Sequence, residues 1–166
     1  MTNKLLSSKV EGKVNQLIAE ELRAMYTYVA AANWCQENGY LNAYDYFISE
    51  SKDEKEHSEI LQKYVLDMGC VPELFDIDAP PSDYKTLSDV LYAAKEMETE
   101  LGKKYSKTAS EILTDDFMTV TKLQEFIVKQ TESIGFYGDI CAVADGLSKD
   151  KYQQLMLEEI LIKNAK

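Results

Sequence analysis

Glycine and proline are scarce in this chain of 166 residues, which contains 7 Gly and 3 Pro. A sandwich or barrel of many short strands needs more turn residues, so we expect an all-α fold. Long apolar runs are also missing. The longest uncharged stretch near the start of the chain, residues 24–36, is shorter than the ~20 residues that a bilayer span needs. Lys4 and Lys9 bracket only two leucines, which is too little for a signal peptide. We therefore expect no membrane segment and a cytoplasmic location.

Cysteine and positive charge are also in short supply. The three cysteines, Cys35, Cys70 and Cys141, are far apart and form no Cys-x-x-Cys pair. A disulfide framework or a thiolate zinc site is therefore not expected, and we interpret all three as small buried hydrophobic residues. The 18 basic residues are outnumbered by 29 acidic ones, giving a net charge of −11. This sign disfavours nucleic acids and anionic membranes as partners and favours cations.

The three prolines lie together in one segment, between Gly69 and Thr86. Both flanks of that segment are free of proline and follow the periodicity of helices. Two antiparallel helical pairs joined by roughly 17 residues predict a four-helix bundle with one long crossover, because ~17 extended residues span the length of a helix. The long helices are expected at about residues 8–37, 41–68, 87–113 and 115–145.

Turn and capping residues define the expected helix ends. Gly39 predicts a tight turn between the first two helices. Thr86 and Thr114 are the expected N-caps of the third and fourth helices, and Gly146 is the expected stop of the fourth. Ser148 is expected to cap a short fifth helix.

Each long helix carries an apolar stripe with a spacing of three or four residues, and one polar residue interrupts each stripe near its middle. The interrupting residues are Glu21, Glu54, Glu98 and Gln130. The midpoints of helices in an antiparallel bundle lie at one level, so we expect these side chains to meet in the core. One buried polar residue in a helix is common, whereas four at one level indicate a site.

The single histidine, His57, follows Glu54 by three residues, which places both side chains on one helical face. Three carboxylates in a core would each cost several kcal/mol to desolvate and would repel one another. No Lys or Arg lies on the four stripes near them, so we expect two divalent cations to compensate their charge. Carboxylates with one imidazole suit iron, manganese or zinc, and the lack of thiolates disfavours a structural zinc site. A redox-active dinuclear iron site is the preferred interpretation.

The motifs of the chain resemble those of the ferritins over nearly the whole length. The matching segments are Ala-Glu-Glu-Leu around Glu21, Tyr28 with the following Asn-Trp-Cys, Asp-Glu-Lys-Glu-His-Ser-Glu at 53–59, Glu98, and Lys-Gln-Thr-Glu-Ser-Ile around Gln130. The resemblance implies a single ferritin-like domain over residues 1–166, with one long crossover and a short C-terminal helix.

The resemblance also implies roles for individual residues. Glu21, Glu54 and His57 would hold the first iron of a ferroxidase centre, with Glu54 bridging to a second iron that Glu98 binds. Gln130 would orient bridging water or oxygen species. Tyr28 would donate an electron or a hydrogen bond, while core packing is the alternative interpretation of this tyrosine.

Three more acidic residues, Asp53, Glu56 and Glu59, resemble the patch where ferritins begin to deposit ferric mineral. Ordinary solvated surface charge is the alternative explanation. Gln130 together with Ser133 resembles the H-type pattern.

Other positions depart from the patterns of related proteins. Lys129 and Ser133 stand where a third iron site would need acidic ligands. Lys55 stands where haem-binding bacterioferritins carry a methionine, so no haem is expected.

The function implied by this resemblance is intracellular iron homeostasis. The chain would oxidise Fe(II) with O2 or peroxide and store ferric oxide inside a homo-oligomeric shell of 24 subunits. A dinuclear-iron oxidase or peroxidase of the rubrerythrin type is the alternative, although the chain lacks a second Glu-x-x-His and a cysteine cluster. A DNA-binding mini-ferritin and a catalytically silent subunit are less favoured.

Overall fold

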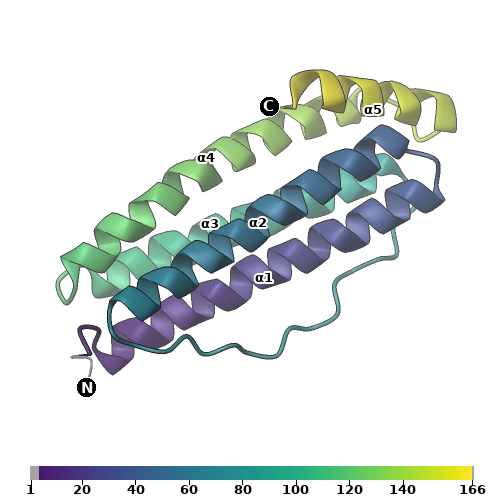
Figure 1. Ribbon diagram of the computed structural model, residues 1–166. Coiled ribbons are helices and arrows are strands. Elements are labelled where there is room, and N and C mark those ends of the chain that lie inside the picture. The colour runs from purple at the N-terminus through teal and green to yellow at the C-terminus, as the bar shows by residue number, and fades with distance from the viewer. Residues whose placement is uncertain (1–3, 166) are drawn as a thin grey trace.

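The computed structural model describes residues 4–165, and every regular element in that range is an α-helix (Figure 1). The helices are α1 (Ser8–Glu37), α2 (Leu41–Asp67), α3 (Leu87–Ile112), α4 (Phe117–Asp145) and α5 (Lys151–Asn164). Helices α1 and α2 form one antiparallel pair and α3 and α4 form another, while the segment between α2 and α3 runs along the bundle (Figure 1). The prediction of an all-α bundle with one long crossover and a short fifth helix is confirmed.

The turn between α1 and α2 depends on Gly39, whose φ of 75° lies in the left-handed region. Residues with a Cβ rarely adopt this conformation, whereas glycine adopts it freely. Gly69, which follows α2, has a φ of 73° for the same reason. The predicted tight turn at Gly39 is therefore confirmed.

The predicted N-caps of α4 and α5 are wrong. The side chain of Asp116, rather than Thr114, accepts a hydrogen bond from the Thr119 backbone N–H at 2.9 Å. Asp150, rather than Ser148, accepts from the Gln153 N–H at 3.1 Å. Several capping residues adjoin one another in both segments, and a carboxylate has the added advantage of facing the positive end of the helix dipole.

The other helix boundaries are close to the predicted ones. Thr86 caps α3 as predicted, and Gly146 is the C-cap of α4. Helices α2 and α3 each end one residue earlier than predicted, at Asp67 and Ile112.

Helix α5 supplies hydrogen-bond acceptors to two other helices. The carboxylate of Glu158 accepts a hydrogen bond at 2.9 Å from the Ala43 backbone N–H in the first turn of α2. Within the described residues, the N-cap residue of α2, Tyr40, makes no side-chain capping hydrogen bond of its own. Gln154 accepts from the Ser88 backbone N–H in the first turn of α3, also at 2.9 Å. The short helix therefore satisfies N–H groups that would otherwise be buried without partners.

The core consists of two apolar clusters, one toward each end of the bundle. The cluster nearer α5 contains Tyr28, Phe47 and Tyr137, and the other contains Leu17 and Leu61 among its largest side chains. The cysteines Cys35, Cys70 and Cys141 are free and buried, as expected. Within residues 4–165, no helix combines the length and apolar character needed to cross a bilayer.

Among the residues that interrupt the four apolar stripes, Glu54, Glu98 and Gln130 lie between these clusters along their helices. Glu21 lies on α1 between Ile18 and Ala24, which both belong to the second cluster. Glu21 and Glu98 have no exposed surface, and Gln130 and Glu54 are 4% and 5% exposed. The sequence therefore correctly predicts that all four interruptions face the core.

Replacing Glu158 by alanine should destabilise the fold, because the Ala43 N–H would lose its buried acceptor. We expect the free energy of unfolding to fall by about 1–3 kcal/mol. Glu159→Ala, at an exposed neighbouring position of α5, should change it by less than about 0.5 kcal/mol. Denaturant unfolding followed by circular dichroism measures both, and equal effects would contradict the capping role of Glu158.

Candidate metal centre

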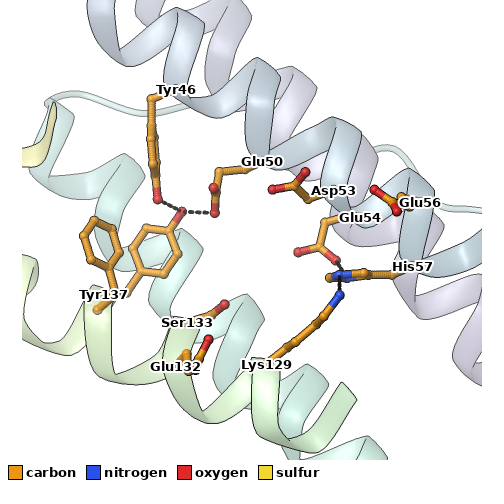
Figure 2. A pocket seen from close by; sticks show the side chains of 11 residues that line it. Tyr46, Glu50, Asp53, Glu54, Glu56, His57, Lys129, Glu132, Ser133 and Tyr137 are labelled. Carbon is orange, nitrogen blue, oxygen red and sulfur yellow. Dashed lines mark hydrogen bonds and ion pairs between the residues drawn. The ribbon is translucent and has the colours of Figure 1, made fainter. Parts of the chain in front are cut away.

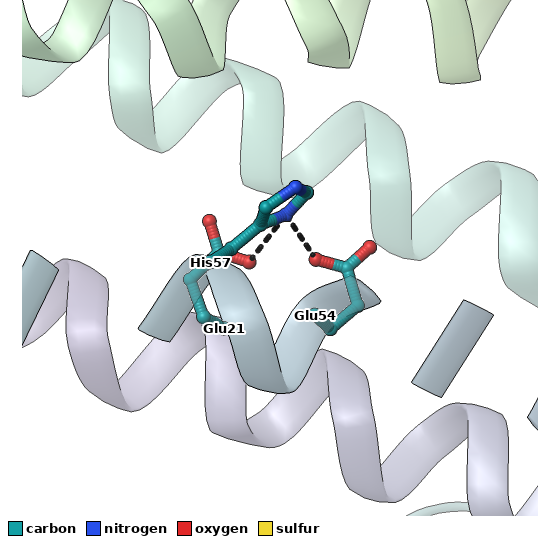
Figure 3. A group of neighbouring side chains, drawn as sticks. All are labelled: Glu21, Glu54 and His57. Carbon is teal, nitrogen blue, oxygen red and sulfur yellow. Dashed lines mark hydrogen bonds and ion pairs between the residues drawn. The ribbon is translucent and has the colours of Figure 1, made fainter. Parts of the chain in front are cut away.

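Helices α1 and α2 bring three potential metal ligands together near the middle of the bundle. His57 Nδ1 lies 3.0 Å from Glu54 Oε2 and 3.7 Å from Glu21 Oε2 (Figure 3). Ligand atoms of all three residues lie within 4.8 Å of one another. Glu54 and His57 share a face of α2 because they are three residues apart, and Glu21 faces them from the adjacent antiparallel helix.

The carboxylates of this group are buried without a basic counter-ion. In the described part of the chain, neither Lys nor Arg forms an ion pair with Glu21, Glu54 or Glu98. Burial raises the pKa of Glu54 well above its ordinary value, and the neighbouring carboxyls of Glu21 and Glu98 raise it further. Within residues 4–165, Glu21 Oε2 is buried and has no hydrogen-bond partner. An uncompensated buried oxygen of this kind is a suitable ligand for a cation.

Glu98 lies beside this group on α3 but is not part of it. Its two carboxylate oxygens accept hydrogen bonds from the Tyr28 hydroxyl and the Gln130 side-chain amide. The Gln130 amide also donates to the Glu98 backbone oxygen at 3.1 Å. Burial raises the pKa of Glu98, although these two hydrogen bonds act in the opposite direction. Tyr28 and Gln130 thus hydrogen-bond to Glu98 rather than to the group formed by Glu21, Glu54 and His57.

Tyr105 is a site residue that sequence reasoning missed. It is buried on α3, and its hydroxyl donates to Glu21 Oε1. The sequence signal that could have located Tyr105 is its hydroxyl, because a buried tyrosine hydroxyl needs a polar partner. Among the residues that the structure describes, Glu21 therefore has one partnered and one unpartnered oxygen.

A cavity of about 390 Å³ opens next to the group, between α2 and α4 (Figure 2). Glu54 and His57 line it, together with Asp53 and Glu56 of the predicted mineral patch. Glu59 does not line this cavity. It lies on an adjoining groove that it shares with Glu56, and it pairs with Lys55 at 3.2 Å. The three predicted patch residues thus follow α2 outward from the cavity instead of lining it together.

Glu50 lines the same cavity one turn before Glu54 and was also missed. The Tyr137 hydroxyl donates to Glu50 Oε2 at 3.4 Å and accepts from the Tyr46 hydroxyl at 3.1 Å (Figure 2). Burial raises the pKa of Glu50 to about 7, and the nearby Glu98 and Asp53 carboxyls contribute. The four-residue spacing to Glu54 was a signal that could have located it.

A model of the ferritin-like domain family matches residues 11–146. The chain belongs to the ferritin family. A bacterial non-haem ferritin of Campylobacter jejuni is 26% identical to this ferritin over 137 residues, which cover 82% of each chain. One of Staphylococcus aureus is 24% identical over 129 residues, covering 77% of this chain and 78% of the relative.

Solved ferritin structures share the fold. An open-pore ferritin of the archaeon Archaeoglobus fulgidus superposes with a TM-score of 0.89 at 22% identity, covering 95% of this chain and 98% of that one. The family model and the two bacterial relatives confirm the predicted resemblance to non-haem ferritins.

The donor set of this ferritin fits iron. Glu21 and Glu54 offer oxygens and His57 offers Nδ1, the combination that borderline and hard divalent metals prefer. The three cysteines lie outside the group of candidate ligands, so the site offers no thiolate for a structural zinc ion.

Glu50→Gln should stabilise the metal-free ferritin at neutral pH. A carboxyl whose pKa rises from 4.5 to about 7 favours the fold fully below pH 4.5, and this contribution is lost as the pH rises through about 7. The neutral amide keeps an acceptor for Tyr137 and avoids the buried charge. The variant should match the wild type at pH 4.5 and exceed its stability by up to about 3 kcal/mol above pH 7.

Unfolding curves recorded from pH 4.5 to 8 with a chelator present measure this difference. Glu96→Gln, at an exposed position of α3, serves as the control and should show no such growing gain. A constant difference between Glu50→Gln and the wild type across the range would contradict the prediction.

Proposed function

We propose that this ferritin oxidises Fe(II) at a dinuclear centre within the subunit and stores the ferric product as a mineral. Fe(II) and either O2 or peroxide are its substrates, and the product collects inside a cytoplasmic shell of 24 identical subunits. The observation that carries the proposal is the buried group of Glu21, Glu54 and His57, whose two carboxylates form no ion pair with Lys or Arg in the described chain. A metal ion compensates such a group, whereas an empty core would gain from apolar residues at these positions.

Each ligand has a distinct task in this proposal. Glu21, Glu54 and His57 Nδ1 hold the first iron, which satisfies the orphaned Glu21 oxygen. Glu54 bridges to the second iron, and Glu98 turns toward that ion from its present contacts with Tyr28 and Gln130. Two irons side by side supply two electrons to the oxidant.

The groups that bond to Glu98 take part in the reaction without holding iron. The Gln130 amide, once released from Glu98, orients water or the oxidant between the irons. The Tyr28 hydroxyl supplies a hydrogen bond or an electron. The combination of Gln130 and Ser133 supports an H-type centre, in which the position of Ser133 contributes no carboxylate.

Storage requires that the oxidised iron leaves the centre. Weak carboxylate ligation lets the product leave, and the cavity between α2 and α4 provides an opening beside the ligands. Asp53 and Glu56 at this opening, followed by Glu59 further along α2, offer oxygens on which a ferric mineral begins. The net charge of −11 per subunit concentrates cations around the shell.

Glu54→Ala and His57→Ala should each lower the initial rate of Fe(II) oxidation at least ~10-fold, because loss of even a second-shell partner commonly costs 10–100-fold. Stopped-flow absorbance after anaerobic Fe(II) is mixed with oxygenated buffer measures the rate. Glu96→Ala, an exposed change on α3, should retain the wild-type rate. Wild-type rates in both site variants, with helical circular dichroism intact, would refute the assignment.

Aerobic iron loading separates storage from a resident cofactor. We expect the protein to sediment as a large homo-oligomer and to retain far more than two irons per subunit, because the product leaves the centre and mineralises. Iron analysis of sedimented particles measures the ratio. A stable monomer or dimer, or a plateau at two irons per subunit, would contradict storage and favour a fixed dinuclear cofactor.

A further inference from the structure

Lys129 lines the cavity, where the family pattern of a third iron site would need an acidic ligand, and it has no part in the proposed reaction. It extends from α4 across the opening to α2, where its Nζ lies 3.1 Å from His57 Nε2 (Figure 2). The opposite ring nitrogen, Nδ1, lies 3.0 Å from Glu54 Oε2. Among the described residues that line the cavity, Lys129 is the single lysine or arginine. The lysine therefore contacts a candidate ligand from the side opposite to the metal position.

The hydrogen-bond chemistry of this contact assigns the tautomer of His57. A lysine ammonium has donors only, so His57 Nε2 must accept from it and carries no hydrogen. The ring hydrogen is then on Nδ1, from which it is donated to Glu54 Oε2. The metal-free centre thus contains a hydrogen-bond relay from Lys129 through His57 to Glu54.

Metal binding requires the opposite arrangement. Nδ1 faces Glu21 and Glu54, so it is the nitrogen that would bind the metal (Figure 3). A neutral imidazole that binds a metal through Nδ1 carries its hydrogen on Nε2, where it is a donor. The Lys129 ammonium would then face a second donor and have no acceptor on the ring.

We propose that Lys129 is a positioning residue that latches His57 in the metal-free state and must release it when iron binds. This inference rests on the proposed function, because it takes His57 as a ligand. A contact present only in the free state lowers metal affinity, since its energy is lost on binding and regained on release. The latch therefore favours the departure of iron, as a centre that passes its product to a store requires.

The cavity offers acceptors for the released ammonium. Glu132 follows Lys129 by three residues on α4, and Glu56 faces the opening from α2. Both carboxylates line the same cavity as Lys129 (Figure 2). Lys129 is exposed, so its ammonium stays solvated beside these carboxylates once it leaves His57.

Solid-state ¹⁵N NMR of the assembled, histidine-labelled protein tests the tautomer directly, because His57 is the single histidine of the chain. Without metal, we expect a hydrogen on Nδ1 and none on Nε2. With saturating Zn(II), a redox-inert probe, we expect a metal-bound Nδ1 and a hydrogen on Nε2. A hydrogen on Nε2 in the metal-free wild type would overturn the latch.

Zn(II) titration of variants, followed at the His57 resonances and by calorimetry, tests the effect on affinity. Lys129→Met should bind Zn(II) about 10-fold more tightly than the wild type, a change of about 1.4 kcal/mol in binding free energy. Lys129→Arg keeps a donor for Nε2 and should stay near the wild type. Lys122→Met is the matched control, because it removes an equal charge from α4 at a lysine that pairs with Glu125 at 3.0 Å.

The outcomes separate the latch from the proposed function. Unchanged or weaker Zn(II) binding by Lys129→Met, or equal tightening by Lys122→Met, overturns the latch while the metal centre stands. A wild type in which Zn(II) leaves the His57 resonances unmoved overturns both the latch and the proposed centre. Tightening confined to Lys129→Met, with a wild-type value for Lys129→Arg, supports the latch.

Discussion

The cost of burying charge is the constraint on which the rest of this structure depends. Glu21, Glu54 and Glu98 lie at one level of a helix bundle, where each charge is expensive unless something compensates it. In the metal-free chain, hydrogen bonds compensate part of this cost, and the raised pKa values of Glu54 and Glu98 compensate another part. Tyr105 hydrogen-bonds to Glu21, and His57 hydrogen-bonds to Glu54. Tyr28 and Gln130 hydrogen-bond to Glu98. One oxygen of Glu21 stays without a partner in the described chain. The lack of compensating partners makes the metal-free core costly, and it also makes these carboxylates suitable ligands for divalent cations.

The surrounding fold holds this polar level in place. Apolar clusters pack on both sides of it, so the helices cannot easily shift to expose the carboxylates. Helix α5 secures the starts of α2 and α3 through Glu158 and Gln154. The cavity between α2 and α4 gives the buried ligands an opening, and acidic side chains continue outward from it along α2.

Periodicity along each helix was sufficient to predict the bundle, the long crossover and the burial of Glu21, Glu54, Glu98 and Gln130. The N-caps of α4 and α5 were mispredicted because several capping residues adjoin one another there. The roles of Tyr105, Glu50 and Lys129 were not predicted, because their partners lie on other helices and depend on the reach of each side chain. The ligand assignments themselves stay predictions, since the structure groups Glu21, Glu54 and His57 but leaves Glu98 bonded to Tyr28 and Gln130.

Anomalous X-ray diffraction from crystals soaked anaerobically in Fe(II) tests the central claim most directly. The account predicts an iron peak bound by Glu21, Glu54 and His57 Nδ1, and a second peak within reach of Glu54 and Glu98. Ligand distances should be about 2.0–2.2 Å, as in other carboxylate and imidazole sites. An absence of anomalous density between these residues, with the carboxylates still buried and bonded only to protein groups, would contradict the account.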